Sequence, residues 1–469
     1  MSKSMFKKKA VFKKAAVASA VVAALSVTSA HAVNLAEDGL GEAFIVPYYT
    51  ANNGFNTYLH ITNTSGETTA AKIRFREGYN SREVRDFNIV LSPFDVWTGV
   101  ITKDDTTGGG KLITYDTTCT VPSVIAATSP TNPGSTLFTP AEYDGSEDLK
   151  QDGGPDGFVR TLEGYVEIFS MGRDGTITGT ANDFAALSDN AKHEDKGGFR
   201  APVDCATVES QFGAANLVNT RAQLDEPTNS LQVTAQVLNV MDGTGYGVNA
   251  VTFANFFNPL DVDGASSDNL IVGPGSRIPN FNQVSPPVSE IHDNEVGTQV
   301  LSVWNGAGQQ PILAVDAVLM RNTLINRFRA DAGQADTDWV ITFPTKWAHV
   351  DKDADGNPDN ATVAGLAPFV ELYTDDESIN GGESKVQVGI NSYDREEGVF
   401  HSTSSCTDPF THETFPISDP SLCPSPTIPT SPTHAFLKYE VNVVEFGNGI
   451  FGSQLSDATL NGQDRKSTV

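Results

Sequence analysis

The sequence predicts an all-β protein built as an immunoglobulin-like β-sandwich, with long irregular surface inserts. Three observations support this fold class. Short runs of alternating apolar and polar residues recur along the chain and are separated by turn residues. The chain holds 41 Gly and 25 Pro, and only 19% of its residues are charged. The N-terminus has the pattern of an export signal, which is typical of secreted β-rich proteins.

The N-terminal segment 1–32 is predicted to be a signal peptide. Six lysines precede the uncharged apolar run 15–27, and Ala30-His31-Ala32 forms a small-residue cleavage site. A membrane anchor is the alternative, but the run is short for a bilayer span. No later stretch reaches about 18 apolar residues, so we expect no transmembrane segment after cleavage. The predicted location is therefore the medium or the outer cell surface, with the periplasm as a further possibility.

The mature chain is strongly acidic. Cleavage removes six of the 31 basic residues and none of the 58 acidic ones. A negative exterior repels nucleic acid and anionic lipid, so we expect neither as a partner. Such a surface is well solvated and attracts cations.

Four cysteines follow the cleavage site: Cys119, Cys205, Cys406 and Cys423. In an exported protein they most economically form two disulfides. Three pairings are possible. The preferred one joins Cys406 to Cys423 within a Pro/Ser/Thr-rich loop and Cys119 to Cys205 between two inserts. The cysteines are too widely spaced for a typical zinc site.

Alternating patterns place strands throughout the first half of the chain, and Pro47 is expected to break the first of them. In the segment 71–76, Ile73 and Phe75 share one face, while Lys72, Arg74 and Arg76 share the other. The expected strands are 43–46, 57–63, 71–76, 86–91, 96–101, 158–171, 231–240 and 248–257. Residues 102–157 and 197–228 have the composition of loops with little regular structure.

The Pro286-Pro287 pair is the best candidate for a domain boundary. We therefore expect an N-terminal sandwich domain, 33–285, that carries the insert 102–157. A C-terminal β domain, 286–469, would hold the acidic loop 351–359 and the Pro/Ser/Thr-rich insert 402–433. Its expected strands are 339–343, a continuation at 346–350, 369–373, 385–391 and 435–446.

The acidic loop 351–359 is the sharpest candidate site. It places oxygen-bearing side chains at every second position around Gly356, namely Asp351, Asp353, Asp355, Asn357 and Asp359. Calcium prefers six to eight oxygen ligands from such a flexible loop. The pattern resembles the D-x-D-x-D-G loops of EF-hands and of several extracellular repeat families. The twelfth position is Thr362 instead of Glu, which favours a calcium loop anchored on a strand over an EF-hand. A solvated turn without metal is the alternative.

Signatures of catalysis are mostly missing from the sequence. It contains no G-x-S-x-G, no H-E-x-x-H and no phosphate-binding G-x-x-x-x-G-K-[ST] motif. Glycoside hydrolysis by a carboxylate pair stays open, with candidates Glu163, Glu167, Glu371 and Glu440 on or beside strands. Eight aromatic residues could line a sugar-binding face or fill the core: Tyr48, Tyr49, Phe55, Tyr58, Trp97, Trp304, Trp339 and Trp347.

Three stretches, LAEDGLGEAFIVPYYT, TYLHITNTS and TDWVITFPTKW, resemble a group of poorly characterised exported or cell-surface proteins of Gram-negative bacteria. The resemblance implies an extracytoplasmic, β-rich protein and supplies no catalytic residue. We therefore expect a non-catalytic structural or adhesive protein of the cell exterior, with calcium as a stabilising ion. A polysaccharide-binding or polysaccharide-degrading protein is the alternative. The expected partners are surface polysaccharide or further copies of the chain, which could add to exposed strand edges.

Overall fold

A computed structural model describes most of the chain between residues 31 and 445. The described residues are 31–146, 154–174, 185–257, 271–293, 298–306, 310–325, 338–350, 368–370, 384–390, 405–407, 414–416 and 433–445. The predicted signal peptide 1–32 therefore lies almost entirely outside them.

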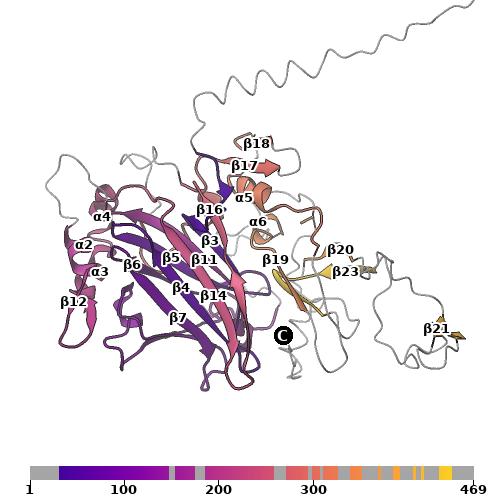
Figure 1. The fold of residues 1–469 in the computed structure, drawn as a ribbon, viewed down its shortest axis with the longest axis horizontal. Helices are drawn as coiled ribbons and strands as arrows, with labels where there is room; N and C mark the ends of the chain where they lie inside the picture. The colour runs from indigo at the N-terminus through magenta and orange to yellow at the C-terminus, as the bar shows by residue number, and fades with distance from the viewer. Residues whose placement is uncertain are drawn as a thin grey trace, which may run out of the picture.

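Two antiparallel sheets of seven strands each form the body of the molecule (Figure 1). The first sheet has the order β1 (Asn34–Leu35), β16 (Val251–Ala254), β3 (Ala43–Thr50), β11 (Glu163–Arg173), β5 (Thr69–Glu77), β6 (Glu83–Leu91) and β9 (Cys119–Val121). The second has the order β10 (Gly134–Leu137), β8 (Gly110–Thr114), β7 (Val96–Lys103), β4 (Asn56–Asn63), β14 (Leu231–Asn239) and β15 (Thr244–Asn249), and β2 (Leu40–Gly41) also pairs with β14. The predicted all-β sandwich is confirmed.

The main core lies between the two sheets and follows from the two-residue period of the strands. On β4, Leu59 and Ile61 point inward and are fully buried, as their alternation predicts. Ile73 and Phe75 on β5 meet them from the first sheet. Trp97 on β7 is also fully buried and packs against an aromatic ring of β6.

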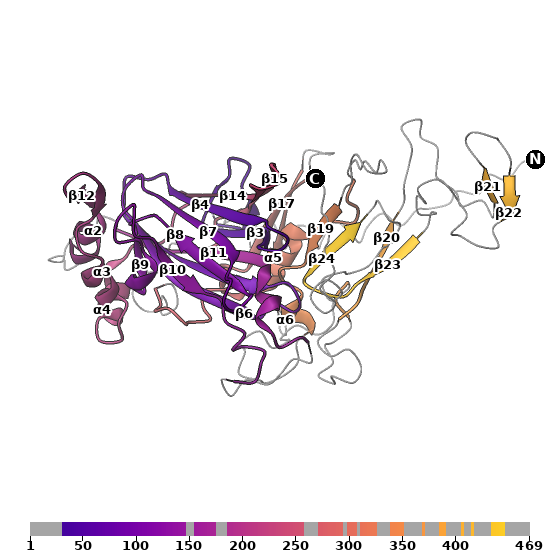
Figure 2. The same ribbon diagram turned by 90° about the horizontal axis from the view of Figure 1, so that it is seen from below.

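The outer face of the first sheet is covered at both ends (Figure 2). Helices α2 (Ala185–Ala191), α3 (Cys205–Gln211) and α4 (Leu217–Gln223) lie at one end, and their apolar residues pack with β5, β6 and β9. Helices α5 (Ile312–Leu319) and α6 (Trp347–Val350) and strand β24 (Val441–Glu445) lie toward the other. The apolar cluster at this second end joins residues from both sides of the predicted boundary at Pro286.

Smaller elements complete the described part. Five two-stranded sheets pair β12 (His193–Asp195) with β13 (Arg200–Pro202), β17 (Val288–Asp293) with β18 (Thr298–Val303), β19 (Asp338–Thr342) with β24, β20 (Val386–Ile390) with β23 (Thr433–Leu437), and β21 (Ser405–Thr407) with β22 (Thr414–Pro416). Short 3₁₀ turns occur at η2 (Ser123–Ile125), η3 (Phe158–Leu162) and η5 (Phe281–Gln283).

Residues 102–157 differ from the prediction of a surface insert with little regular structure. In their described part, β8 and β10 extend the second sheet, and β9 extends the first. Leu112 and Phe138 from this segment are fully buried in the main core. The loop prediction for 197–228 is also wrong, because β13, α3 and α4 lie there.

Three local strand predictions are wrong as well. Strand β3 continues through Pro47, because its pairing with β11 shifts register there and needs no N–H from the proline. The expected continuation at 346–350 is instead the single helical turn α6. The expected strand 435–446 is two strands, β23 and β24, separated at residues 438–440.

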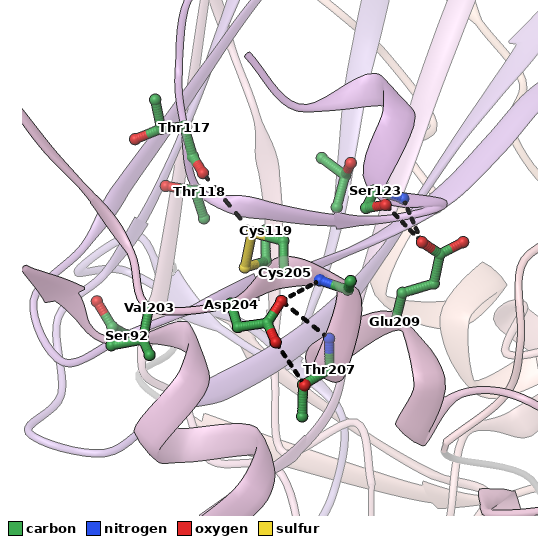
Figure 3. Close-up of a disulfide and its surroundings, with 12 residues drawn as sticks. Ser92, Thr117, Thr118, Cys119, Ser123, Val203, Asp204, Cys205, Thr207 and Glu209 are labelled. Atoms are coloured by element: carbon green, nitrogen blue, oxygen red, sulfur yellow. Dashed lines mark hydrogen bonds between the residues drawn. A yellow bond between two sulfur atoms is a disulfide. The ribbon is translucent and has the colours of Figure 1, made fainter. Parts of the chain in front are cut away.

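A disulfide joins Cys119 on β9 to Cys205, the first residue of α3 (Figure 3), as predicted. Asp204 caps α3 by accepting hydrogen bonds from the backbone N–H groups of Ala206 and Thr207 at 3.0 and 3.3 Å. Because β9 is an edge strand, the bond fastens a helix over an edge that would otherwise be free to pair. Cys423 lies outside the described residues, so its pairing with Cys406 stays a prediction.

Candidate functional site

The outer face of the second sheet is the candidate functional site. Strands β4, β7 and β14 alternate strictly, and their outward side chains are half-buried or exposed. We call this surface the open face and define it by Tyr58, His60, Thr62, Thr98, Val100, Thr102, Ile113, Gln232, Thr234 and Gln236. In the part of the chain that the structure describes, its side chains stay accessible, in contrast to the covered outer face of the first sheet.

The strand register sets the layout of the open face. Tyr58 lies between Gln236 on β14 and Val100 on β7. His60 lies in the next row, between Thr234 and Thr98 on the same two strands. Because β4 is a central strand, Tyr58 and His60 occupy the middle of the surface, with neighbouring strands about 4.8 Å apart.

The chemistry of the open face is neutral and rich in hydrogen-bonding groups. None of its defining residues is Asp or Glu, although the chain has a net charge of −27. Most carry hydroxyl, amide or imidazole groups on side chains held by a regular backbone ladder. Such a surface offers fixed donors and acceptors around one aromatic ring. Two half-buried charged side chains lie at its β8 edge: Lys111 opposite Thr102, and Asp116, which accepts hydrogen bonds from the backbone N–H and the hydroxyl of Thr98 at 3.1 and 3.5 Å.

The first sheet carries a contrasting feature, a buried charged stripe on its outer face. The predicted sharing of one face by Lys72, Arg74 and Arg76 is confirmed, and all three side chains are buried. Arg74 lies 2.7 Å from Glu83 and 3.2 Å from Glu167, and Arg76 lies 2.9 Å from the same Glu167.

The segment 273–279 covers the charged stripe. The carbonyl oxygens of Ser276 and Pro279 accept hydrogen bonds from Arg74 at 3.0 and 2.9 Å. The backbone N–H of Gly275 donates to both carboxylate oxygens of Asp86, at 3.0 and 2.9 Å. Gly275 has a φ of +76°, a conformation that glycine adopts without strain and that other residues rarely adopt.

Burial shifts the titration of several of these groups. Desolvation and the neighbouring charge of Asp86 raise the pKa of Glu83 to about 8. Desolvation lowers the pKa of Lys72 below its usual range, against the opposing pull of Asp86. Elsewhere, desolvation raises the pKa of Glu42 to about 7, although it accepts a hydrogen bond from the backbone N–H of Phe257.

Of the four carboxylates considered for glycoside hydrolysis, the three that the structure describes are buried. Glu167 is fully buried between two arginines, and Glu440 is fully buried 3.9 Å from Lys346. Glu163 is buried and accepts hydrogen bonds from Thr50 and Asn52. Glu371 lies outside the described residues. These three buried side chains, two of which pair with cations, cannot reach a polysaccharide chain in this conformation.

The aromatic candidates separate into core and surface. The buried ones are Tyr48, Tyr49, Phe55, Trp97 and Trp347. Tyr58, Trp304 and Trp339 are half-buried, and only Tyr58 of these belongs to the open face. Tyr58 was a candidate from the sequence, but the surface formed by its neighbours on β4, β7 and β14 was not predicted. The signal was available in the polar outward positions of the two strands 57–63 and 231–240.

The acidic loop at 351–359 lies outside the described residues, so its calcium site stays a prediction. Within the described ranges, no group of three or more His, Cys, Asp or Glu side chains is arranged to hold a metal ion. None of the helices in those ranges is long and apolar enough to cross a membrane.

The fold and the open face together define a β-sandwich with one covered and one accessible outer sheet face. Comparison of the chain with protein-family models, with curated proteins and with solved structures gave no match in any of the three. The chemistry of these surfaces is therefore the main evidence for what the protein does.

Proposed function

We propose that this chain is a non-catalytic adhesive protein of the cell exterior that binds a neutral polysaccharide across the open face. One observation carries the proposal: a broad, accessible sheet face, free of Asp and Glu at its defining positions, with Tyr58 and His60 at its centre.

The groups on the open face match those that a sugar chain requires. The ring of Tyr58 is an amphipathic platform on which the apolar face of a sugar can pack. Gln236 beside that ring on β14, and His60 two positions along β4, supply hydrogen-bonding groups. Successive sugars can extend over neighbouring strands, because the side chains repeat at the strand spacing.

A neutral ligand fits the charge distribution better than an acidic one. An acidic polysaccharide would meet long-range repulsion from a chain with a net charge of −27. A strongly basic partner would find no carboxylate among the residues that define the open face. Hydrogen bonding and ring packing therefore remain as the main sources of affinity.

An exterior location is supported by the predicted signal peptide and by the disulfide. A structural disulfide between Cys119 and Cys205 persists in oxidising compartments and is rare in the cytosol. The acidic composition suits a solvated exterior.

The test is a glycan array probed with the purified, processed chain, followed by titration of the best neutral glycan. We expect Tyr58→Ala to weaken binding about tenfold or more, equivalent to about 1.4 kcal/mol. Tyr58→Phe should retain most of the affinity, because it keeps the ring. Tyr115→Ala is the matched control, since this tyrosine is 60% exposed and follows the end of β8.

Three results would contradict the proposal. The first is the absence of binding to any neutral glycan by the wild-type chain. The second is equal loss of affinity in the Tyr58→Ala and Tyr115→Ala variants. The third is hydrolysis of the bound glycan, which would replace adhesion with catalysis.

A further inference from the structure

Lys72 and Asp86 form an unusual pair within the charged stripe. The two residues lie on the adjacent central strands β5 and β6, and Lys72 Nζ is in direct contact with Asp86 Oδ2. The Lys72 side chain is 0% exposed and that of Asp86 is 8% exposed. The amine and the carboxyl group are therefore held together away from bulk water.

We propose that Lys72 and Asp86 become joined by an intramolecular isopeptide bond. In this reaction Lys72 Nζ attacks Asp86 Cγ, a new C–N bond forms, and the C–O bond to one carboxyl oxygen breaks. The departing oxygen leaves as water, so a neutral amine and a neutral carboxylic acid give one amide and one water. No oxidant, reductant or second substrate is required.

The surroundings favour the neutral reactants. A desolvated ion pair gains by internal proton transfer, because burial penalises both charged forms. The positive charge of Arg74 adds to this effect, and the pKa of Lys72 is lowered. A neutral lysine amine in a dry site is an effective nucleophile.

Glu83 lies beside the pair and contributes to its electrostatic environment. Its carboxylate is bound by Arg74 Nε at 2.7 Å, and burial together with the charge of Asp86 raises its pKa to about 8. The proton that Nζ loses passes directly to the departing Asp86 oxygen, with which Nζ is in contact, and that oxygen leaves as water.

The cover segment completes the site. The N–H of Gly275 donates to both carboxyl oxygens of Asp86 and is therefore directed at the oxygen that gains negative charge during attack. The carbonyl oxygen of Gly273 accepts a hydrogen bond from Lys72 Nζ at 3.5 Å, which restricts the amine. Fixing both reactants supplies a large effective concentration, on the order of 10⁵ M or more in well-oriented intramolecular reactions.

The experiment is intact-mass measurement of the processed, folded chain, followed by peptide mapping. We expect the wild-type mass to be lower by one water than the sequence with its disulfides requires. Trypsin should fail to cleave after Lys72 and should release a branched species that links the peptide ending at Arg74 to peptide 86–103. Unmodified mass, with cleavage after Lys72, would overturn the proposal.

Variants separate the chemistry from folding. Lys72→Arg and Lys72→Met should both restore the full mass, and Lys72→Met removes the buried charge where Lys72→Arg strains the fold. Lys346→Arg is the matched control, because Lys346 is also fully buried but lies 3.9 Å from Glu440. It should retain the loss of one water. Retention of that loss in either Lys72 variant would refute the bond.

Discussion

The Cys119–Cys205 disulfide gives the most direct test of how the edge of the first sheet is held. We consider the double variant Cys119→Ala, Cys205→Ala. The two cysteines are 86 residues apart in sequence. Loop-closure entropy for a loop of that length corresponds to about 4–5 kcal/mol of lost stability. Cys119 is fully buried, so truncation to alanine also removes packing in the cluster beneath α2 and α3.

The assay is equilibrium unfolding in urea, with hydrogen exchange as a local readout. We expect the free energy of unfolding to fall by about 4 kcal/mol, with protection lost first in α3 and β9. Reduced wild-type protein should behave like the variant. Because reductant also acts on Cys406 and Cys423, the variant itself is measured with and without reductant as the control.

A clear result would refute this reasoning. If the free energy of unfolding of the double variant falls by less than about 1 kcal/mol, then the disulfide does not measurably restrict the unfolded chain. If α3 keeps its protection, then the packing of Val208 and Phe212 holds the helix on the edge without the covalent link.

Two further predictions concern buried carboxylates. The pKa of Glu42 is raised from 4.5 to about 7 in the folded state. The contribution of Glu42 to the free energy of unfolding is therefore most favourable below pH 4.5 and is lost as the pH rises through 7. In urea unfolding, Glu42→Gln should therefore have the stability of wild type near pH 4.5. At pH 8 it should be more stable than wild type by up to about 3 kcal/mol. Equal stability of the two proteins at pH 8 would contradict this prediction. Glu167→Gln leaves Arg74 and Arg76 without their shared counter-charge and should cost about 3–5 kcal/mol by the same assay. Glu194, which forms an exposed ion pair with Lys196, is the control, and Glu194→Gln should cost less than about 0.5 kcal/mol. Similar losses of stability in the Glu167 and Glu194 variants would refute the importance of the buried pairing.

The sandwich was predictable because its central strands have a clean two-residue period. Leu59 and Ile61 alternate with polar residues, and this alternation alone indicates which side faces the core. The short strands β8, β9 and β10 were not predictable in the same way, because they span only three to five residues. Their pairing is determined by tertiary contacts, such as the 2.7 Å hydrogen bond from Gly110 N to Thr161 Oγ1.

The segment 346–350, predicted as a strand, shows a second limit of prediction from sequence. Trp347 and His349 have the composition of a strand, but both side chains are buried in a single helical turn. The ring of Trp347 lies under the guanidinium group of Arg76, 5.3 Å from its centre, and His349 contacts Asp316 at 2.9 Å. Partners that are distant in sequence override local propensity here.

The charged stripe could be located from the sequence but not interpreted. Lys72, Arg74 and Arg76 alternate with core residues, a pattern that normally indicates a solvated face. Their acidic partners come from β6 and β11, and Glu167 is 93 positions away from Arg74 in the sequence.

Burial of this stripe costs free energy, because each charged side chain loses its contact with water. That cost is offset only where each charge has an opposite charge beside it. Arg74 meets this condition through Glu83 and Glu167, and Arg76 through Glu167. Lys72 has one carboxylate within reach and sits beside the positive charge of Arg74. An amide between Lys72 and Asp86 would remove both charges from the interior and leave a neutral link between β5 and β6. The covalent bond thus resolves the one pair in the stripe whose electrostatics are least favourable, and this is why Lys72 is the residue at which we expect it.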